Sequence, residues 1–166
     1  MTTILMMARI WRAVVIGVLS TLSMDLLTGV STWLRLVSPL PPNLVGRWFA
    51  SVARVQPFHA NIARSSPVNH ELLLALPVHY AIGTVLAALF VWAISELGWP
   101  HGLGGSLAFG LCTSILPWLL MFPAMGYGFF GANGPEGTRL FISSLISHAF
   151  FGVGLWMAIH TVKLAA

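Results

Sequence analysis

The sequence predicts an all-α membrane protein: a four-helix transmembrane bundle with a short interfacial amphipathic helix in its first loop. Two observations support this fold class. First, 57% of the 166 residues are hydrophobic and only 7% are charged, whereas a soluble domain carries roughly 25% charged residues. Second, four segments are mostly apolar over about 20 residues, the length that an α-helix needs to cross the hydrocarbon core of a bilayer. The solvent of this chain is therefore expected to be lipid.

The four predicted spans belong to one polytopic membrane domain, residues 1–166. They cover about residues 12–36, 72–97, 103–122 and 140–162. The first span is the least apolar because it contains Asp25 and several Ser and Thr residues. Only a few residues separate the second span from the third, so these two helices are expected to form a tight antiparallel hairpin.

The other two connections are long, and the alternation of four spans puts them on the same side of the membrane. In the first, apolar side chains recur at i, i+3, i+4 and i+7, which is the periodicity of one helix face. The apolar face contains Val45, Trp48, Phe49 and Val52, and the opposite side contains Arg47, Ser51 and Arg54. This pattern predicts an amphipathic helix over about residues 43–55, lying in the membrane interface.

Several classes of function are not indicated. The net charge is +4, but the basic residues are scattered singly, without the basic patch that binds a nucleic acid backbone. Cys112 is the only cysteine, which excludes a disulfide framework and a cysteine-based metal motif. Metalloprotease, nucleophile-elbow and P-loop motifs are absent from the sequence. We assign no catalytic residue, and a non-enzymatic role is favoured over an enzymatic one.

Each span carries small or polar residues at helical spacing along one face. Examples are Gly17 and Thr21 in the first span, Gly83 in the second, Gly110 in the third and Gly152 in the fourth. Small residues let membrane helices approach closely, so these stripes are expected to be packing seams. In the first, second and fourth spans the seam also contains an ionisable residue.

These ionisable residues are Asp25, His79 and His148. At the helical rise per residue they lie about 15, 10 and 12 Å from the membrane face that bears the long loops. Charged groups at such depth are costly, by roughly 2.5–3.5 kcal/mol on insertion scales, and usually face a partner or a water-filled cavity. The same side of the membrane carries further polar residues that we include as candidate pathway residues: Glu71, Arg139, Arg47 and His59.

The polar and small residues also follow a recognisable order along the chain. The order is Met24-Asp25-Leu26, Gly46-Arg47, Phe58-His59, Glu71, His79-Tyr80 with Gly83, Pro117, Gly126-x-Gly128, Pro135, Arg139, and His148 with Gly152. This order resembles a family of small bacterial inner-membrane proteins, domain of unknown function 2938. The chain departs from the family pattern at Ala75-Leu76-Pro77, where the family has Gly-Trp ahead of His-Tyr. The resemblance implies four spans and a multi-pass location in the bacterial inner membrane, and it implies no activity.

Three hypotheses about function follow. In the first, Asp25, His79 and His148 line a polar cavity that transports protons, a metal ion or a small solute. In the second, the two histidines ligate a haem or a divalent metal ion, with Asp25 as a further metal ligand. In the third, the polar groups are structural and the protein serves in envelope assembly. The expected partners are the lipid bilayer and further copies of the chain, because four helices are few for a complete transporter.

Overall fold

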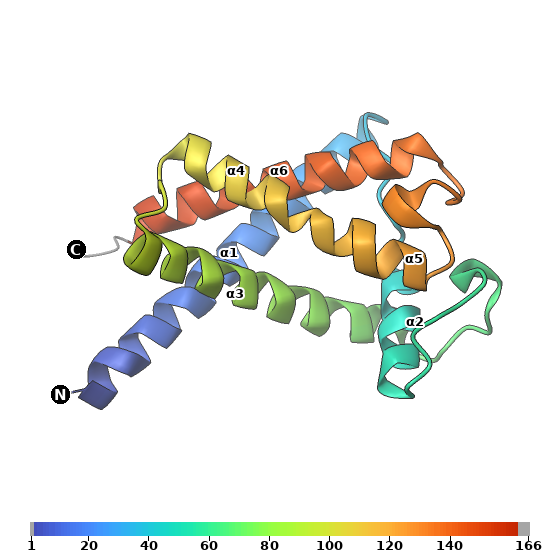
Figure 1. The fold of residues 1–166 in the computed structure, drawn as a ribbon, viewed down its shortest axis with the longest axis horizontal. Coiled ribbons are helices and arrows are strands. Elements are labelled where there is room, and N and C mark those ends of the chain that lie inside the picture. The colour runs from blue at the N-terminus through green and yellow to red at the C-terminus, as the bar shows by residue number, and fades with distance from the viewer. Residues whose placement is uncertain (1, 163–166) are drawn as a thin grey trace. The chain divides into compact units, whose positions relative to one another are not determined.

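The structure is a computed structural model that describes residues 2–162 and is 75% helical, with no strand in that part of the chain. Figure 1 shows the helices in chain order. They are α1 (Thr2–Trp33), α2 (Pro42–Ala53), η1 (Ile62–Arg64), α3 (Glu71–Leu97), α4 (Leu103–Thr113), η2 (Pro117–Met121), α5 (Phe122–Ala124), η3 (Phe129–Gly131) and α6 (Thr138–Val162). The all-α fold class predicted from the sequence is confirmed.

Four helical segments in the described residues are long and apolar enough to cross a membrane. They are Ile10–Trp33, Glu71–Leu97, Leu103–Ala124 and Thr138–Val162. Their positions agree with the four predicted spans to within a few residues. Helix α1 itself begins earlier than the predicted span, at Thr2. The protein is therefore a multi-pass membrane protein.

The third span is not a uniform α-helix. Helix α4 ends at Thr113, and the segment Pro117–Met121 is a π-helix, η2, followed directly by α5. Proline has no backbone N–H and cannot continue the regular i to i−4 hydrogen bonding of an α-helix. Single π-helical turns inside a longer helix are rare and often mark functional regions. The third span therefore changes its helical type at Pro117.

The described chain consists of two compact units. Unit 1 contains the segments up to Leu27, Tyr80–Thr113 and from His148 onward; unit 2 contains Thr28–His79 and Ser114–Ser147.

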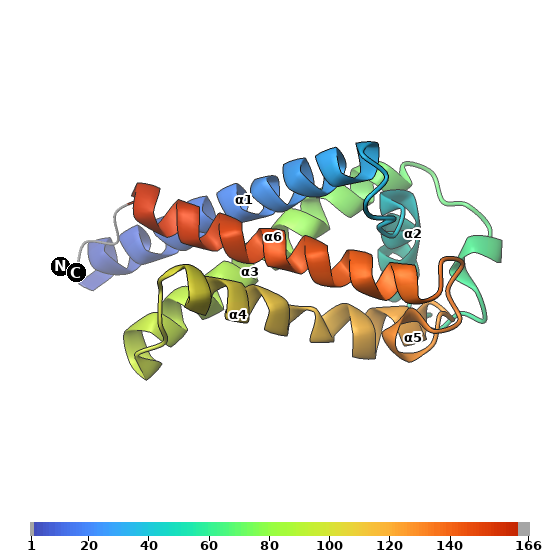
Figure 2. The same ribbon diagram turned by 90° about the horizontal axis from the view of Figure 1, so that it is seen from above.

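Unit 1 is a bundle of α1, α3, α4 and α6 that pack through their small residues. A side chain on Gly17 of α1 would overlap the Thr84 backbone of α3, and one on Gly110 of α4 would meet Gly152 of α6 at 2.7 Å. Figure 2 shows α4 and α6 side by side. These contacts confirm that the stripes are packing seams. A core beside the seams is formed by Ile16, Ala87, Phe90, Phe151, Leu155, Ala158 and Ile159.

Unit 2 contains both long connections, and backbone hydrogen bonds join them. The His59 N–H donates to the Ala124 carbonyl at 2.8 Å, and the Ile62 N–H donates to the Met125 carbonyl at 2.9 Å. Gly126 lies against the His59 and Ala60 carbonyls with φ +85°, where a side chain would overlap the Ala60 carbonyl. The two loops therefore lie together, as the alternation of the spans predicts.

Two helices end in the same backbone motif. After α1, the Arg35 N–H donates to the Thr32 carbonyl and the Leu36 N–H to the Ser31 carbonyl. After α2, Val55 and Gln56 donate to Val52 and Ser51 in the same pattern. This is the Schellman motif, which satisfies the last carbonyl groups of a helix and places one residue in the left-handed region. Arg35 and Val55 hold that position, each with φ 60°, although glycine is the usual residue there.

Candidate functional site

The first polar pair within a membrane span joins α1 to α3 in unit 1. Asp25 and Tyr80 are side-chain hydrogen-bond partners, and both are half-buried. Their helices approach closely because Gly83 of α3 packs directly on Thr21 of α1. The Thr21 hydroxyl donates to the Gly17 carbonyl of its own helix, and the Thr84 hydroxyl donates to the Tyr80 carbonyl. The threonines are thus satisfied within their helices, and Asp25 and Tyr80 form the polar contact between the helices.

The second polar pair in unit 1 joins α4 to α6. The Thr113 Oγ1 lies 2.7 Å from Nδ1 of His148 and 2.6 Å from the Gly110 carbonyl oxygen. The hydroxyl has one proton, and donating it to Gly110 requires His148 to donate Nδ1–H to Thr113. In neutral His148, Nε2 is then the ring nitrogen without a proton. The close packing of Gly110 on the His148 backbone brings the two side chains together.

His79 lies half-buried on α3 in unit 2, whereas Asp25, Tyr80 and His148 belong to unit 1. A cavity shared by Asp25, His79 and His148 stays a prediction. Among residues 2–162, no three His, Cys, Asp or Glu side chains are grouped so that they could hold a metal ion. The described part of the chain therefore offers no ligand set for a metal ion with three such ligands.

Two other predicted residues, Arg47 and Glu71, form a buried ion pair in unit 2. Arg47 Nε lies 2.6 Å from Glu71 Oε1 and Nη2 lies 3.2 Å from Oε2, the two-point geometry of guanidinium with carboxylate. Arg47 Nη1 also donates to the carbonyl groups of Ile62 and Ser65, at 3.2 and 2.8 Å. The Val68 N–H donates to the same carboxylate at 2.7 Å, and the Asn43 side chain is a further hydrogen-bond partner. This pair connects α2 to the start of α3 and to the loop between them.

The position of Arg47 corrects part of the amphipathic pattern. The predicted helix is present as α2, but Arg47 is only 6% exposed and does not belong to an outward polar face with Arg54. The physical reason is Gly46, which packs directly on the Glu71 backbone and lets α2 approach α3. At that short separation, Arg47 reaches a buried acid whose charge it neutralises.

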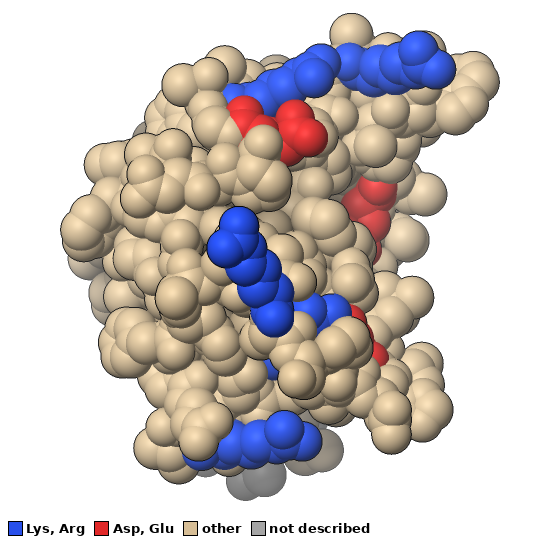
Figure 3. All heavy atoms as spheres, turned by 90° about the vertical axis from the view of Figure 1, so that its right-hand side faces the viewer, with Lys and Arg blue, Asp and Glu red and all other residues tan. Residues whose placement is uncertain are grey.

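The remaining predicted residues also belong to unit 2, His59 in the first long connection and Arg139 in the first turn of α6. His59 lines an open pocket of about 510 Å³ together with residues of both long connections. Arg139 is exposed near the start of α6, and its backbone N–H donates to the Glu136 carbonyl at 3.1 Å. Figure 3 views the face that carries these loops and shows Arg side chains spread over it with fewer acidic ones.

Sequence reasoning missed Thr113 and Tyr127 as functional or structural polar residues. Thr113 follows Gly110 of the small-residue stripe by three positions, and this spacing on one helix face is the signal that indicates it. Tyr127 is completely buried in unit 2, and its hydroxyl has no hydrogen-bond partner among the described residues. Burial raises the pKa of Tyr127, and the Arg47 charge partly opposes that rise. No local pattern around Tyr127 predicts its burial.

Comparison with known proteins identifies the family of this chain. No curated protein and no solved structure matches the chain. A family model described as protein of unknown function (DUF2938) matches residues 14–162, from within the first span to the end of α6. The resemblance drawn from the order of polar and small residues is thus confirmed, and the chain belongs to the DUF2938 family.

Proposed function

We propose that this protein transports protons or another small cation across the bacterial inner membrane, using Asp25 as the cation-accepting group. The observation that carries the proposal is the hydrogen-bonded pair of Asp25 and Tyr80, inside two apolar helices that could span a membrane. Ionisable groups at membrane depth are rare and commonly mark ion pathways or proton relays.

The local surroundings of the pair support this role over a purely structural one. A packing seam needs only small residues, and Gly17, Gly83 and their threonine partners already supply that contact between α1 and α3. The carboxylate is not needed to satisfy the threonine hydroxyls, which bond within their own helices. Asp25 therefore adds a costly titratable group to an interface that is already formed.

His148 supplies a second titratable group in unit 1. The Thr113 hydroxyl holds Nδ1 of His148 and so orients the ring, and imidazole is a side chain that can exchange protons near neutral pH. His79 is included in the proposal as a further pathway residue on α3. The lack of a three-residue metal-ligand group in residues 2–162 favours protons or a monovalent cation over a bound divalent metal.

The location and assembly are part of the same proposal. Many apolar side chains point outward, among them Leu26, Val85 and Leu120, each at least 60% exposed, which suits contact with lipid. A helical bundle suits an inner membrane, because proteins that span the bacterial outer membrane are β-barrels. We also propose a homo-oligomer, which crosslinking in native membranes tests: a monomer only, at all crosslinker concentrations, contradicts it.

The test is a flux assay with the full chain reconstituted in proteoliposomes. A pH-sensitive dye inside the vesicles reports proton movement, and exchange of Na⁺ for K⁺ outside reports cation dependence. Asp25→Asn keeps the size of the side chain and an oxygen for Tyr80 to bond, so folding is retained while titration is lost. We expect Asp25→Asn to reduce the flux at least tenfold.

The matched control is Glu96→Gln, which removes an exposed carboxylate near the end of α3 and is expected to leave the flux unchanged. His148→Gln and His160→Gln form a second matched pair, because His160 is exposed near the end of α6. A wild-type flux in Asp25→Asn would refute the role of Asp25. The absence of any flux in the wild-type protein, for protons and for monovalent cations, would favour a structural or assembly role.

A further inference from the structure

The pocket between the two long connections of unit 2 is lined mainly by polar side chains, one of them basic and none of them acidic. Its lining comes from residues 59–61, 64 and 65 of the first connection and from residues 126 and 133 of the second. The polar side chains that line it are those of His59, Asn61, Arg64, Ser65 and Asn133. The lining thus includes one guanidinium group and two side-chain amides, and no Asp or Glu.

His59 contributes a polar atom that lacks a partner. Its Nε2 is buried and makes no hydrogen bond to the described residues. A buried nitrogen without a partner destabilises the folded protein, so such atoms usually bind a ligand or water. The other polar groups of the pocket are only partly used: Asn61 accepts from the Ala63 N–H through its oxygen, and Ser65 donates to the Ile62 carbonyl. Their amide hydrogens and hydroxyl lone pairs stay available.

The pocket is held in place by the backbone. Hydrogen bonds from the His59 and Ile62 N–H groups join the first connection to the end of α5 and the residue after it. Gly126 packs on the His59 and Ala60 carbonyls, closer than any other residue type allows. Two loops that are distant in sequence are therefore fixed against each other at the place where the pocket forms.

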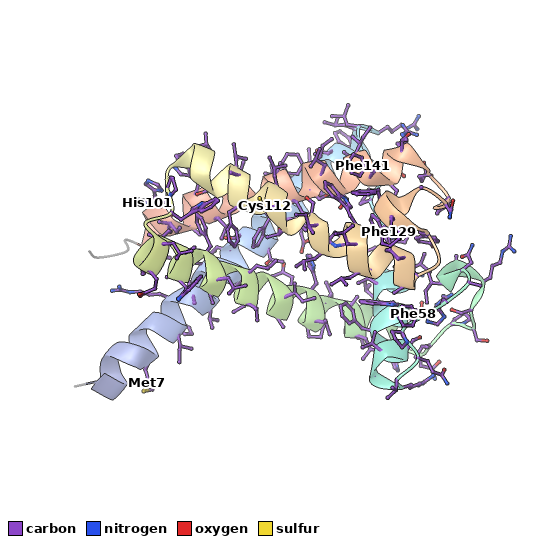
Figure 4. The ribbon with its side chains drawn as sticks, in the orientation of Figure 1. Met7, Phe58, His101, Cys112, Phe129 and Phe141 are labelled. Carbon is purple, nitrogen blue, oxygen red and sulfur yellow. The ribbon has the colours of Figure 1, made fainter. Side chains whose placement is uncertain are left out.

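The position of the pocket limits its ligand. All of its lining residues lie outside the four helical segments that could cross a membrane. Two large apolar side chains that are close to lining residues along the chain are exposed, Phe58 at 81% and Phe129 at 62%. Figure 4 labels both, Phe58 in the connection after α2 and Phe129 in the segment after α5. Exposed aromatic rings next to basic groups are typical of a surface at the lipid–water boundary.

We propose that this pocket binds a phosphate group, carried by an anionic phospholipid headgroup or by a small water-soluble phosphate ester. Arg64 neutralises the charge, since guanidinium matches phosphate geometry at two points. The amides of Asn61 and Asn133 donate to the remaining oxygens. A rotation of the His59 ring brings its Nε2–H, which is buried in the ligand-free protein, to the same phosphate group. A volume of about 510 Å³ is within the range of small-ligand sites and admits the phosphate with its attached ester. The proposal does not depend on the transport role of Asp25.

The experiment measures binding to the purified full chain in a mild detergent by native mass spectrometry. Four probes separate the possible sources: phosphatidylglycerol, diacylglycerol without a phosphate, oleate with a carboxylate, and glycerol 3-phosphate in water. We expect binding of phosphatidylglycerol and not of diacylglycerol or oleate. Binding of glycerol 3-phosphate as well assigns the site to phosphate esters in general, and its absence assigns the site to lipid headgroups. Equal binding of phosphatidylglycerol and oleate, or of phosphatidylglycerol and diacylglycerol, overturns the proposal.

Two matched arginines separate the pocket from general surface charge. Arg64→Gln removes the guanidinium of the pocket, and this exposed side chain forms no hydrogen bond or ion pair with the described residues. Loss of one charged hydrogen-bonding group is expected to weaken binding about tenfold or more. Arg54→Gln removes an exposed arginine at the end of α2, outside the pocket, and is expected to change affinity less than about twofold. Equal weakening in both variants overturns the proposal, because the binding is then caused by diffuse charge.

His59→Leu tests the unpartnered nitrogen. Because Nε2 makes no bond in the described structure, its loss is expected to leave the stability of the ligand-free protein unchanged or higher. Phosphate binding is expected to fall severalfold in the same variant. A variant that binds phosphatidylglycerol with wild-type affinity contradicts the assignment of His59 to the site.

Discussion

Breaking the buried ion pair between Arg47 and Glu71 is expected to cause a large loss of folding stability. The two residues are 6% and 9% exposed, so neither charge is compensated by water if its partner is removed. Arg47→Met keeps the length and most of the volume of the side chain but removes every donor. The Glu71 carboxylate then loses two hydrogen bonds, and the carbonyl groups of Ile62 and Ser65 lose one each.

The magnitude follows from these losses. Removing one partner of a buried ion pair typically costs 3–5 kcal/mol, and two unpaired carbonyl groups favour the upper part of that range. We therefore expect Arg47→Met to lower the free energy of unfolding by about 4 kcal/mol. The double variant Arg47→Met with Glu71→Leu removes both charges, and it is expected to lose clearly less stability than the sum of the two single variants.

The assay is equilibrium unfolding in mixed detergent micelles with a rising fraction of denaturing detergent, followed by tryptophan fluorescence and circular dichroism. Arg54→Met is the control, because Arg54 is an exposed arginine at the end of the same helix. A loss in Arg47→Met that is no larger than the loss in Arg54→Met would refute the reasoning. So would strict additivity in the double variant, because the ion pair would then contribute no coupling energy.

Three further predictions use the same unfolding assay. Gly17→Ala is expected to destabilise the protein by several kcal/mol, because the new side chain overlaps the Thr84 backbone. Its control is Gly29→Ala, whose side chain meets nothing within 4 Å and which is expected to be neutral or slightly stabilising. Equal effects of the two substitutions would contradict the close contact of α1 with α3. Val55→Gly is expected to stabilise by about 1 kcal/mol, because a β-branched residue at φ 60° is strained and glycine is not, and a destabilised variant would contradict this. Tyr127→Phe is expected to be neutral or stabilising at pH 8, since the buried hydroxyl has no partner among the described residues. The pKa of Tyr127 is raised in the folded protein, so the free energy of unfolding of the wild type is highest below about pH 10, the unfolded pKa, and falls as the pH rises toward the folded pKa. Tyr127→Phe should lack that fall in stability between about pH 9 and 11. Identical pH profiles of the two proteins would show that the hydroxyl is not desolvated.

Hydropathy alone predicts the helices of this protein to a good approximation. Each span is a continuous apolar run, and in lipid such a run forms a helix because every backbone group must be hydrogen-bonded within the segment. The amphipathic helix after the first span is also readable, since its apolar residues repeat at helical spacing. The packing faces of the spans are also predictable from the sequence, because small residues repeated along one helix face indicate close packing even when the partner helix is not known.

The partners of the polar residues could not be read in the same way. Arg47 and Arg54 lie about two helical turns apart on the same side of the predicted helix. Their surroundings differ, because Arg47 pairs with Glu71 and Arg54 is exposed. Nothing in the local pattern distinguishes them, because the difference depends on Gly46 and on a helix that begins 24 residues after Arg47. Likewise, Thr113 and His148 are 35 residues apart and meet only because Gly110 packs on α6.

By itself, the sequence determined the class of the protein, the number and limits of its spans, its packing faces and the set of ionisable residues within the membrane. These properties depend on composition and on periodicity along one helix, which are local quantities. Only the tertiary structure decided that Asp25 pairs with Tyr80, that Arg47 is buried against Glu71 and that His59 lines a pocket built from two loops. Each of these depends on contacts between segments distant in the chain, and the energy of a polar side chain is set by the groups that surround it after packing.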